Sequence, residues 1–410
     1  MASSLPPPSG PTHTLRTHSS PVNALYVTDD NERIYSGDSS GVIVVTSTRT
    51  LRPIAKWNAH KDGVLGVEEW DQFIVTHARD NKLHVWDRIE EPPPSMRIGS
   101  GTAALVDLPT PKLKYSMDVN ALNFCRFSLL RLPCESEPAQ QALIALPNLV
   151  DSSSADIWTL HGCDRVHAAI GQGLNKTDIQ SPATEFKVGI IMSLHLYLVT
   201  SEVKREASLP TTELRLLCTY ENGSIVLWKY TREDHLKSVE GQGWDMIWTS
   251  KLHAESIMAM RVSRNNDFAL TVSVDHIVGR YDLKEESADV DETCKKHRTK
   301  HPGNGCIAIR DDGKVCAIGG WDGKICLYST KSFKPLGTLR HHKVGCQAME
   351  FCHLRRLSGN NSGTGADEDE DDEQAQEKRS RWLVCGAKDH RVTIWELVDF
   401  ERKAKTSEDK

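Results

Sequence analysis

The chain has 410 residues, of which 39% are hydrophobic and 26% charged, with a formal net charge of −6. This acidic balance argues against nucleic acid as the main ligand, because proteins that bind it usually carry a strong basic surface. We expect neither a secretory signal nor a membrane span, and the eleven cysteines lack framework spacing, so reduced thiols in the cytosol or nucleus are expected.

In chain order, the predicted elements are short strands separated by polar turns. The first run covers 12–16 and directly precedes His18, and an apolar run follows at 22–27. A turn at Ser40 then leads, six positions later, to Thr46 at the end of another run. Strand-sized runs with polar turns between them indicate an all-β architecture.

The second unit shows the pattern most clearly. It starts at His60, continues with runs at 64–67 and 73–76, turns at 79–81 and ends with a run at 83–86. These are again short strands joined by tight polar turns, so the unit predicts another part of the same sheet-forming repeat.

The same frame recurs along the rest of the chain. A polar turn residue is followed six positions later by an aromatic residue, in the pairs Asp80 and Trp86, Ser152 and Trp158, Asn222 and Trp228, Asp275 and Tyr281, Asp322 and Tyr328, and Asp389 and Trp395. A histidine begins many copies, at His18, His60, His253, His301 and His342. A repeat of about 40–45 residues, with insertions, matches units of four strands each.

The residue patterns resemble the WD-repeat family. The resemblance is carried by THARDNKLHVWD at 76–87 and CGAKDHRVTIW at 385–395, and it covers nearly the whole chain, from Thr12 to Leu397. It implies an all-β, seven-bladed WD40 β-propeller. Since 12–16 stands where other copies have their outer strand, the N-terminal strand is expected to complete the last blade and to cover its exposed edge.

The resemblance also implies a structural hydrogen-bond network in several blades. Its expected members are His60, Thr76, Asp80 and Trp86 in blade two; His253, Thr271 and Asp275 in blade five; His301 and Asp322 in blade six; and His342, Asp389 and Trp395 in blade seven. Blade five departs at Tyr281, blade six at Ile318 and Tyr328, and blade seven has Cys385 at the hydroxyl position. Blades one, three and four depart most.

We expect a flexible tail at 1–10, the propeller at 11–398 and a C-terminal tail at 399–410. The last blade contains an insertion at about 358–380 with seven consecutive acidic residues, which predicts disorder.

The sequence favours no catalytic, cofactor or metal site. His60, Thr76 and Asp80 look like a hydrolase triad, but the same types recur in several blades, and neither G-x-S-x-G nor a phosphate-binding loop is present. Cys294 and His297 lack a second ligand pair at zinc spacing. We therefore expect a protein that is not an enzyme.

The N-terminal motifs PTHTLRTHSSPV at 11–22, IYSGDSSG at 34–41 and WNAHKDGVLG at 57–66 resemble the fungal ASTRA-associated WD-repeat proteins. That resemblance implies a scaffold in a nuclear assembly linked to chromatin remodelling, with HEAT-repeat subunits that support phosphatidylinositol-kinase-related proteins, and without direct nucleic-acid or membrane contacts. The alternatives are a G-protein β-like signalling adaptor and a ubiquitin-ligase substrate receptor.

Overall fold

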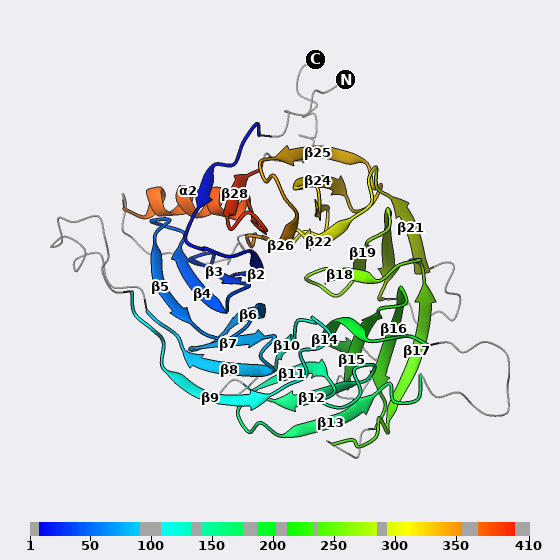
Figure 1. Cartoon of the computed structure of the whole chain (residues 1–410). Helices are drawn as coiled ribbons and strands as arrows, with labels where there is room; N and C mark the ends of the chain where they lie inside the picture. The colour runs from blue at the N-terminus through cyan, green and yellow to red at the C-terminus, as the bar shows by residue number, and fades with distance from the viewer. Residues whose placement is uncertain are drawn as a thin grey trace.

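Seven sheets of four antiparallel strands form a ring in the computed structural model (Figure 1). The structure describes residues 8–90, 108–132, 141–174, 187–201, 211–232, 237–284, 293–354 and 368–397. The prediction of a seven-bladed β-propeller is therefore confirmed. Among the residues described, no helical segment has the length and apolar character needed to span a bilayer.

In blades one to six, the strands follow chain order from the centre of the ring outward. Blade one contains β2 (Val22–Val27), β3 (Arg33–Asp38), β4 (Val42–Ser47) and β5 (Pro53–Asn58). Blade two contains β6 (Val64–Trp70), β7 (Phe73–Ala78), β8 (Lys82–Asp87) and β9 (Leu113–Asp118). Blade three contains β10 (Ser128–Arg131), β11 (Ala142–Pro147), β12 (Ala155–Thr159) and β13 (Arg165–Ile170).

Blades four to seven repeat the arrangement. Blade four contains β14 (Ile191–Ser201), β15 (Thr211–Tyr220), β16 (Ser224–Tyr230) and β17 (Trp244–Lys251). Blade five contains β18 (Ile257–Val262), β19 (Phe268–Ser273), β20 (Ile277–Asp282) and β21 (Cys294–Arg298). Blade six contains β22 (Asn304–Ile309), β23 (Val315–Gly320), β24 (Lys324–Ser329) and β25 (Pro335–Arg340). Blade seven contains β26 (Cys346–Phe351), β27 (Trp382–Ala387), β28 (Val392–Glu396) and β1 (His13–Leu15).

The hydrophobic core lies between the blades. Strands β19 and β27 are buried along their whole length, which explains why their sequences are nearly continuous apolar runs and do not alternate. The cluster between blades seven and one joins Leu15, Val22, Leu25, Trp382 and Ile394. Each sheet thus uses its neighbours to cover both of its faces.

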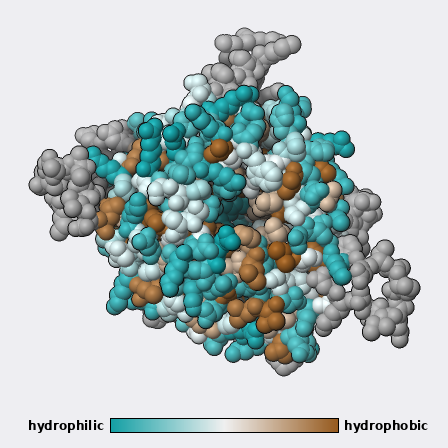
Figure 2. All heavy atoms as spheres, in the orientation of Figure 1, coloured by the Kyte–Doolittle hydropathy of each residue, from teal (hydrophilic) through white to brown (hydrophobic). Residues whose placement is uncertain are grey.

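A β-bulge recurs near the start of six innermost strands. The register shifts directly after Val22, Val64, Ile191, Ile257, Asn304 and Cys346. A bulge bends a strand and increases its local twist. The repeated position gives the inner strands a common bend where they approach the central opening, which is visible as a hollow in Figure 2.

The N-terminal strand closes the ring, as the sequence predicts. His13, Thr14 and Leu15 pair with Ile394, Thr393 and Val392 of β28. The backbone N–H of Thr12 donates to the Ile394 carbonyl at 2.8 Å, which extends the ladder by one bond. Leu15 is buried against the first blade.

The structure differs from the expected disorder at 358–380. Residues Glu368–Ser380 form the helix α2, whereas 355–367 lie outside the described residues. The sequence places acidic residues at the N-terminal end of α2, and Lys378 and Arg379 occupy its last turn, which suits the helix dipole. The mostly buried Arg379 side chain also forms an ion pair with Glu32 at 3.4 Å. The charge composition of the insertion did not reveal that Arg379 would attach α2 to Glu32 of blade one.

We predict that removing residues 1–17 destabilises the whole propeller. The deletion exposes the β28 edge and the apolar surface beneath Leu15, and loss of a buried leucine side chain alone costs about 2–5 kcal/mol. Thermal unfolding of the truncated protein measures the effect. Removal of residues 1–10 is the matched control and should leave the midpoint unchanged, because it spares β1; equal midpoints for both truncations would contradict closure by this strand.

Candidate functional site

Four side chains of blade two form a buried polar chain. The Nδ1 atom of His60 lies 3.1 and 3.2 Å from the carboxylate oxygens of Asp80, and Nε2 lies 2.8 Å from the Thr76 hydroxyl. The indole N–H of Trp86 donates to the same hydroxyl at 2.9 Å. This network requires the His60 tautomer that carries its proton on Nδ1. It ties the turn before β8 to the connection before β6.

Blade five repeats the chain with one substitution. His253 contacts Asp275 at 3.1 Å through Nδ1 and the Thr271 hydroxyl at 2.8 Å through Nε2. The hydroxyl of Tyr281 stands 3.4 Å from that of Thr271, at the place of the tryptophan N–H. The structure therefore brings the three expected residues of this blade together.

In blade seven the hydroxyl comes from a different strand. His342 Nδ1 lies 3.0 Å from Asp389, but Nε2 contacts the hydroxyl of Thr393 at 2.9 Å, and Trp395 donates to that hydroxyl at 3.1 Å. Thr393 on β28 pairs directly with Cys385 on β27. The network thus survives the cysteine because a hydroxyl on the neighbouring strand replaces the missing one.

Blade one contains a network that the sequence analysis missed. His18 contacts Asp38 and the Ser36 hydroxyl, each at 2.8 Å. The repeat frame points to Ser40 as the turn residue, whereas the carboxylate comes from Asp38, two positions earlier. Asp38 also accepts hydrogen bonds from the backbone N–H groups of Ser40 and Val42. The sequence signal that could have revealed this network was Asp38, a carboxylate close to the expected turn at Ser40.

Blade six does not bring the expected pair together. His301 is exposed, and Asp322 accepts hydrogen bonds from the backbone N–H and the ammonium group of Lys324. Ile318 stands at the position of the threonine and offers no hydroxyl to a histidine Nε2. A cavity of about 40 Å³ lies between these residues and Tyr328. The expectation of a His301–Asp322 network is therefore wrong in this structure.

One group in the described part of the chain has ligand atoms close enough to suggest a metal. His60, Asp80 and His84 place three such atoms within 4.8 Å of one another. The rings of His60 and His84, however, are stacked, with centroids 4.5 Å apart and an interplanar angle of 17°. Lone pairs in two parallel ring planes do not converge on one ion at 2.0–2.1 Å. The arrangement fits the blade network better than a metal centre.

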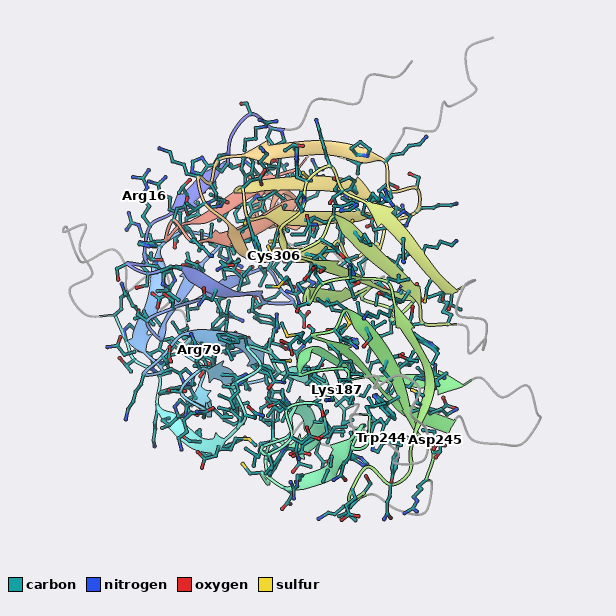
Figure 3. All side chains as sticks on the ribbon, turned by 45° about the vertical axis from the view of Figure 1, so that its right-hand side comes forward. Arg16, Arg79, Lys187, Trp244, Asp245 and Cys306 are labelled. Carbon is teal, nitrogen blue, oxygen red and sulfur yellow. The ribbon has the colours of Figure 1, made fainter. Side chains whose placement is uncertain are left out.

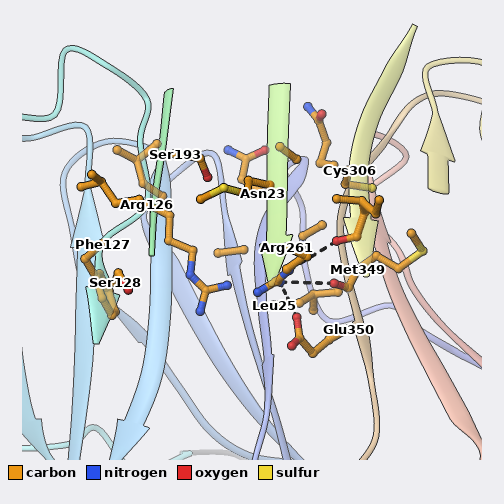
Figure 4. Close-up of a pocket in the computed structure, with 18 of the residues that line it drawn as sticks. Asn23, Leu25, Arg126, Phe127, Ser128, Ser193, Arg261, Cys306, Met349 and Glu350 are labelled. Atoms are coloured by element: carbon orange, nitrogen blue, oxygen red, sulfur yellow. Dashed lines mark hydrogen bonds and ion pairs between the residues drawn. The ribbon is translucent and has the colours of Figure 1, made fainter. Parts of the chain in front are cut away.

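The innermost strands line a central channel with a cavity of about 390 Å³. Cys306, one of the lining residues, lies near the middle of the ring in Figure 3. Arg126 forms an ion pair with Glu68. Arg261 forms one with Glu350, which Figure 4 shows as a dashed line. The sequence analysis identified no charged groups converging here. The sequence signal for these charges was the presence of Arg126 and Arg261 in two innermost segments that are otherwise mainly apolar.

These channel charges neutralise one another in pairs. Arg261 also donates to the backbone carbonyls of Ile307 at 3.3 Å and Met349 at 3.4 Å, so it joins blades five, six and seven. Burial lowers the pKa of His195, on the wall of the channel, to about 4, so its imidazole is neutral at pH 7. Its Nε2 contacts the Asn266 side-chain oxygen at 2.9 Å. The channel is thus lined by paired charges and a neutral histidine.

A second set of ion pairs joins several blades at the ends of their inner strands. Asp29 of blade one contacts Arg131 of blade three at 2.7 Å and Arg264 of blade five at 3.4 Å. Arg264 also contacts Asp311 of blade six at 2.6 Å, and Asp311 contacts His353 of blade seven at 3.2 Å. The two pairs of Asp29 brace blade one against blades three and five, which do not adjoin it, and the other two link the adjacent blades five, six and seven.

Comparison with known proteins gives one family over almost the whole propeller. The family described as ASTRA-associated protein 1 matches residues 11–379. The protein named ASTRA-associated protein 1 of Verticillium alfalfae is 29% identical over 97% of this chain and 95% of its own length. Its Schizosaccharomyces pombe counterpart is 26% identical over 94% and 98%. A mouse protein named guanine nucleotide-binding protein subunit beta-like protein 1 is 23% identical over 97% and 99%.

We predict that His60→Ala and Asp80→Ala each destabilise the propeller by roughly 1–3 kcal/mol, because each leaves a buried partner unsatisfied. The two losses should be strongly non-additive, since both residues belong to one network. Denaturant unfolding of the single and double variants measures the coupling. The control pair His60→Ala with Asp275→Ala, in different blades, should be additive; additive losses for the first pair would disprove the shared network.

We also predict that acid destabilises the protein through its buried histidines. Burial lowers the pKa of His60, His167 and His195 to about 4 and that of His77 to about 3. Unfolded histidines titrate near 6.5. The unfolded state therefore binds more protons below that pH, and stability falls as the pH drops from about 6.5 towards 4, by up to about 3 kcal/mol per histidine.

Denaturant unfolding across this pH range measures the slope. The variant His77→Phe should show a shallower fall, because it removes one buried histidine that resists protonation. A pH-independent free energy of unfolding for the unmodified protein would contradict the prediction.

Proposed function

This chain belongs to the ASTRA-associated protein 1 family, and from that premise we propose that it is a non-catalytic scaffold of an ASTRA-type assembly. Within that assembly it takes part in chromatin remodelling and supports phosphatidylinositol-kinase-related proteins. Its expected partners are the complex's HEAT-repeat subunits and a kinase-related protein of this class. Its expected location is the nucleus.

The observation that carries the proposal is the extent of the family match. Residues 11–379 include the N-terminal closing strand and six complete blades, and the match ends within the helix α2 of the seventh. The curated relatives likewise align over nearly their whole length. The likeness therefore concerns the complete body, and not one repeat shared with unrelated propellers.

The chemistry of the described residues agrees with a scaffold. The histidines that resemble a hydrolase triad are held in hydrogen-bond chains that repeat in blades one, two, five and seven. The arginines and glutamates of the central channel are paired with each other. Groups that satisfy one another stabilise a rigid body, which presents its loops to partners with little loss of conformational entropy on binding.

A second candidate function is that of a G-protein β-like signalling adaptor. It is favoured by the full-length likeness to the mouse guanine nucleotide-binding protein subunit beta-like protein 1. Both candidates are protein-binding scaffolds, and they differ in the proteins that they bring together. Identification of the bound proteins therefore separates them.

The test is affinity purification of the tagged full-length protein from nuclear extract, followed by mass spectrometry. We expect HEAT-repeat subunits and a phosphatidylinositol-kinase-related protein to be recovered at physiological salt. An unrelated seven-bladed propeller with the same tag is the control for binding to the fold in general. Recovery of neither class of partner, or equal recovery by the control propeller, would refute the proposal; recovery of G-protein signalling components would favour the second candidate.

A further inference from the structure

Two neighbouring connections, one leading from β9 of blade two into blade three and one between β11 and β12, expose an unusual amount of apolar surface. Four of the nine exposed large hydrophobic residues in the described part of the chain lie there: Leu122 (73% exposed), Phe124 (58%), Leu149 (45%) and Val150 (94%). We call these four residues the platform. Contiguous apolar patches on otherwise polar surfaces mark interaction sites. Figure 2 shows hydrophobic residues gathered on one side of the central hollow.

Three buried asparagines hold the two connections together. Asn120 donates to the backbone carbonyl of Asn148 at 2.7 Å and to the Ser152 hydroxyl at 2.9 Å. Asn123 donates at 2.8 Å to the carbonyls of both Ser152 and Ile191. The side-chain oxygen of Asn148 accepts from the backbone N–H of Val150 at 2.9 Å. The platform is therefore rigid, which lowers the entropy lost when a partner binds.

Phe124 has an unfavourable backbone conformation. Its φ angle is 55°, in the left-handed region that bulky residues rarely adopt. The ring is nevertheless exposed and borders the mouth of the central channel. Strained, exposed aromatic residues that the surrounding structure holds in place are typical of binding sites.

A basic side chain lies beside the platform. The Arg79 guanidinium carbon lies 4.4 Å from the centroid of the Phe124 ring, and within the described ranges no carboxylate pairs with this guanidinium (Figure 3 labels Arg79). The Asp151 carboxylate, next to Val150 in the chain, accepts hydrogen bonds from the backbone N–H and the hydroxyl of Ser153. Arg79 therefore offers a positive charge next to the apolar surface of Phe124.

We propose that the platform docks a segment of a partner protein in which apolar side chains are flanked by aspartate or glutamate. The apolar side chains would cover Leu122, Phe124, Leu149 and Val150, and a carboxylate would pair with Arg79, whose planar guanidinium can donate two parallel hydrogen bonds. The inference rests on the scaffold function proposed above and assigns one of its contact surfaces. The basic charge selects an acidic segment over a basic one.

The first test locates the contact by cross-linking. A photoreactive phenylalanine analogue replaces Leu122 in the tagged full-length protein, and in a control variant it replaces Met246, an exposed residue of blade four. After irradiation in nuclear extract, mass spectrometry identifies the cross-linked peptides. We expect a peptide rich in Asp or Glu with apolar residues, cross-linked from position 122 and not from 246. A basic peptide, a nucleic acid or a second copy of this chain at position 122 would overturn the proposal, as would the absence of a cross-link.

The second test measures affinity with that peptide made synthetically and labelled with a fluorophore. Leu122→Ser combined with Val150→Ser should weaken binding at least tenfold, and Arg79→Glu should weaken it at least as much and reduce its salt dependence. The matched control Val239→Ser, at another exposed valine, should bind like the unmodified protein. Thermal unfolding checks that each variant is folded. Unchanged affinity of the platform variants would refute the inference.

The two proposals fail in different ways. If the unmodified protein recovers the ASTRA-type partners and the platform variants recover them equally well, with unchanged peptide affinity, the platform inference is wrong and the scaffold function stands. If the unmodified protein recovers none of these partners, the scaffold function itself is wrong.

Discussion

The packing of each sheet against its two neighbours is the constraint on which the whole structure depends. A single blade has two apolar faces and no core of its own, as the full burial of β19 and β27 shows. Seven sheets have fourteen faces between them. Only a closed ring packs every one of these faces against a neighbouring sheet, so that none is left in water. Ring closure, the inter-blade clusters and the ion pairs across the channel all serve this one requirement.

Within that constraint, the blades satisfy their buried polar groups in different ways. Blades two and five place the hydroxyl on the second strand, blade seven takes it from Thr393 on the third strand, and blade one shifts the carboxylate to Asp38. Blade three uses buried asparagines instead. The common demand is that buried donors and acceptors find partners, and not that one set of residues is kept. Blades that depart from the shared pattern are free to present different loops to solvent.

Much of the fold was predictable because the repeat is a local property of the sequence. The six-residue step from Asp80 to Trp86 or from Asp389 to Trp395 lies within one turn and one strand, and its recurrence predicts the blades. The contacts that escaped prediction join residues far apart in the chain. Arg126 and Glu68 are 58 positions apart, and Arg379 meets Glu32 across 347 positions. Thr393 supplies the hydroxyl that Cys385 lacks because the two residues pair across β27 and β28. A single sequence does not display this strand register.

The closing strand has a consequence for how the protein is made. Thr12 and Glu396, which share a hydrogen bond at the closure, are 384 positions apart, so the first strand leaves the ribosome long before its partner exists. Blades one to six can assemble while synthesis continues, but β1 has no sheet to join until β28 has emerged. During that interval the nascent chain carries an unpaired strand at one end and an uncovered sheet face at the other, both of which favour aggregation. Protection of the growing chain over this interval therefore matters more for this architecture than for a domain whose ends pair early.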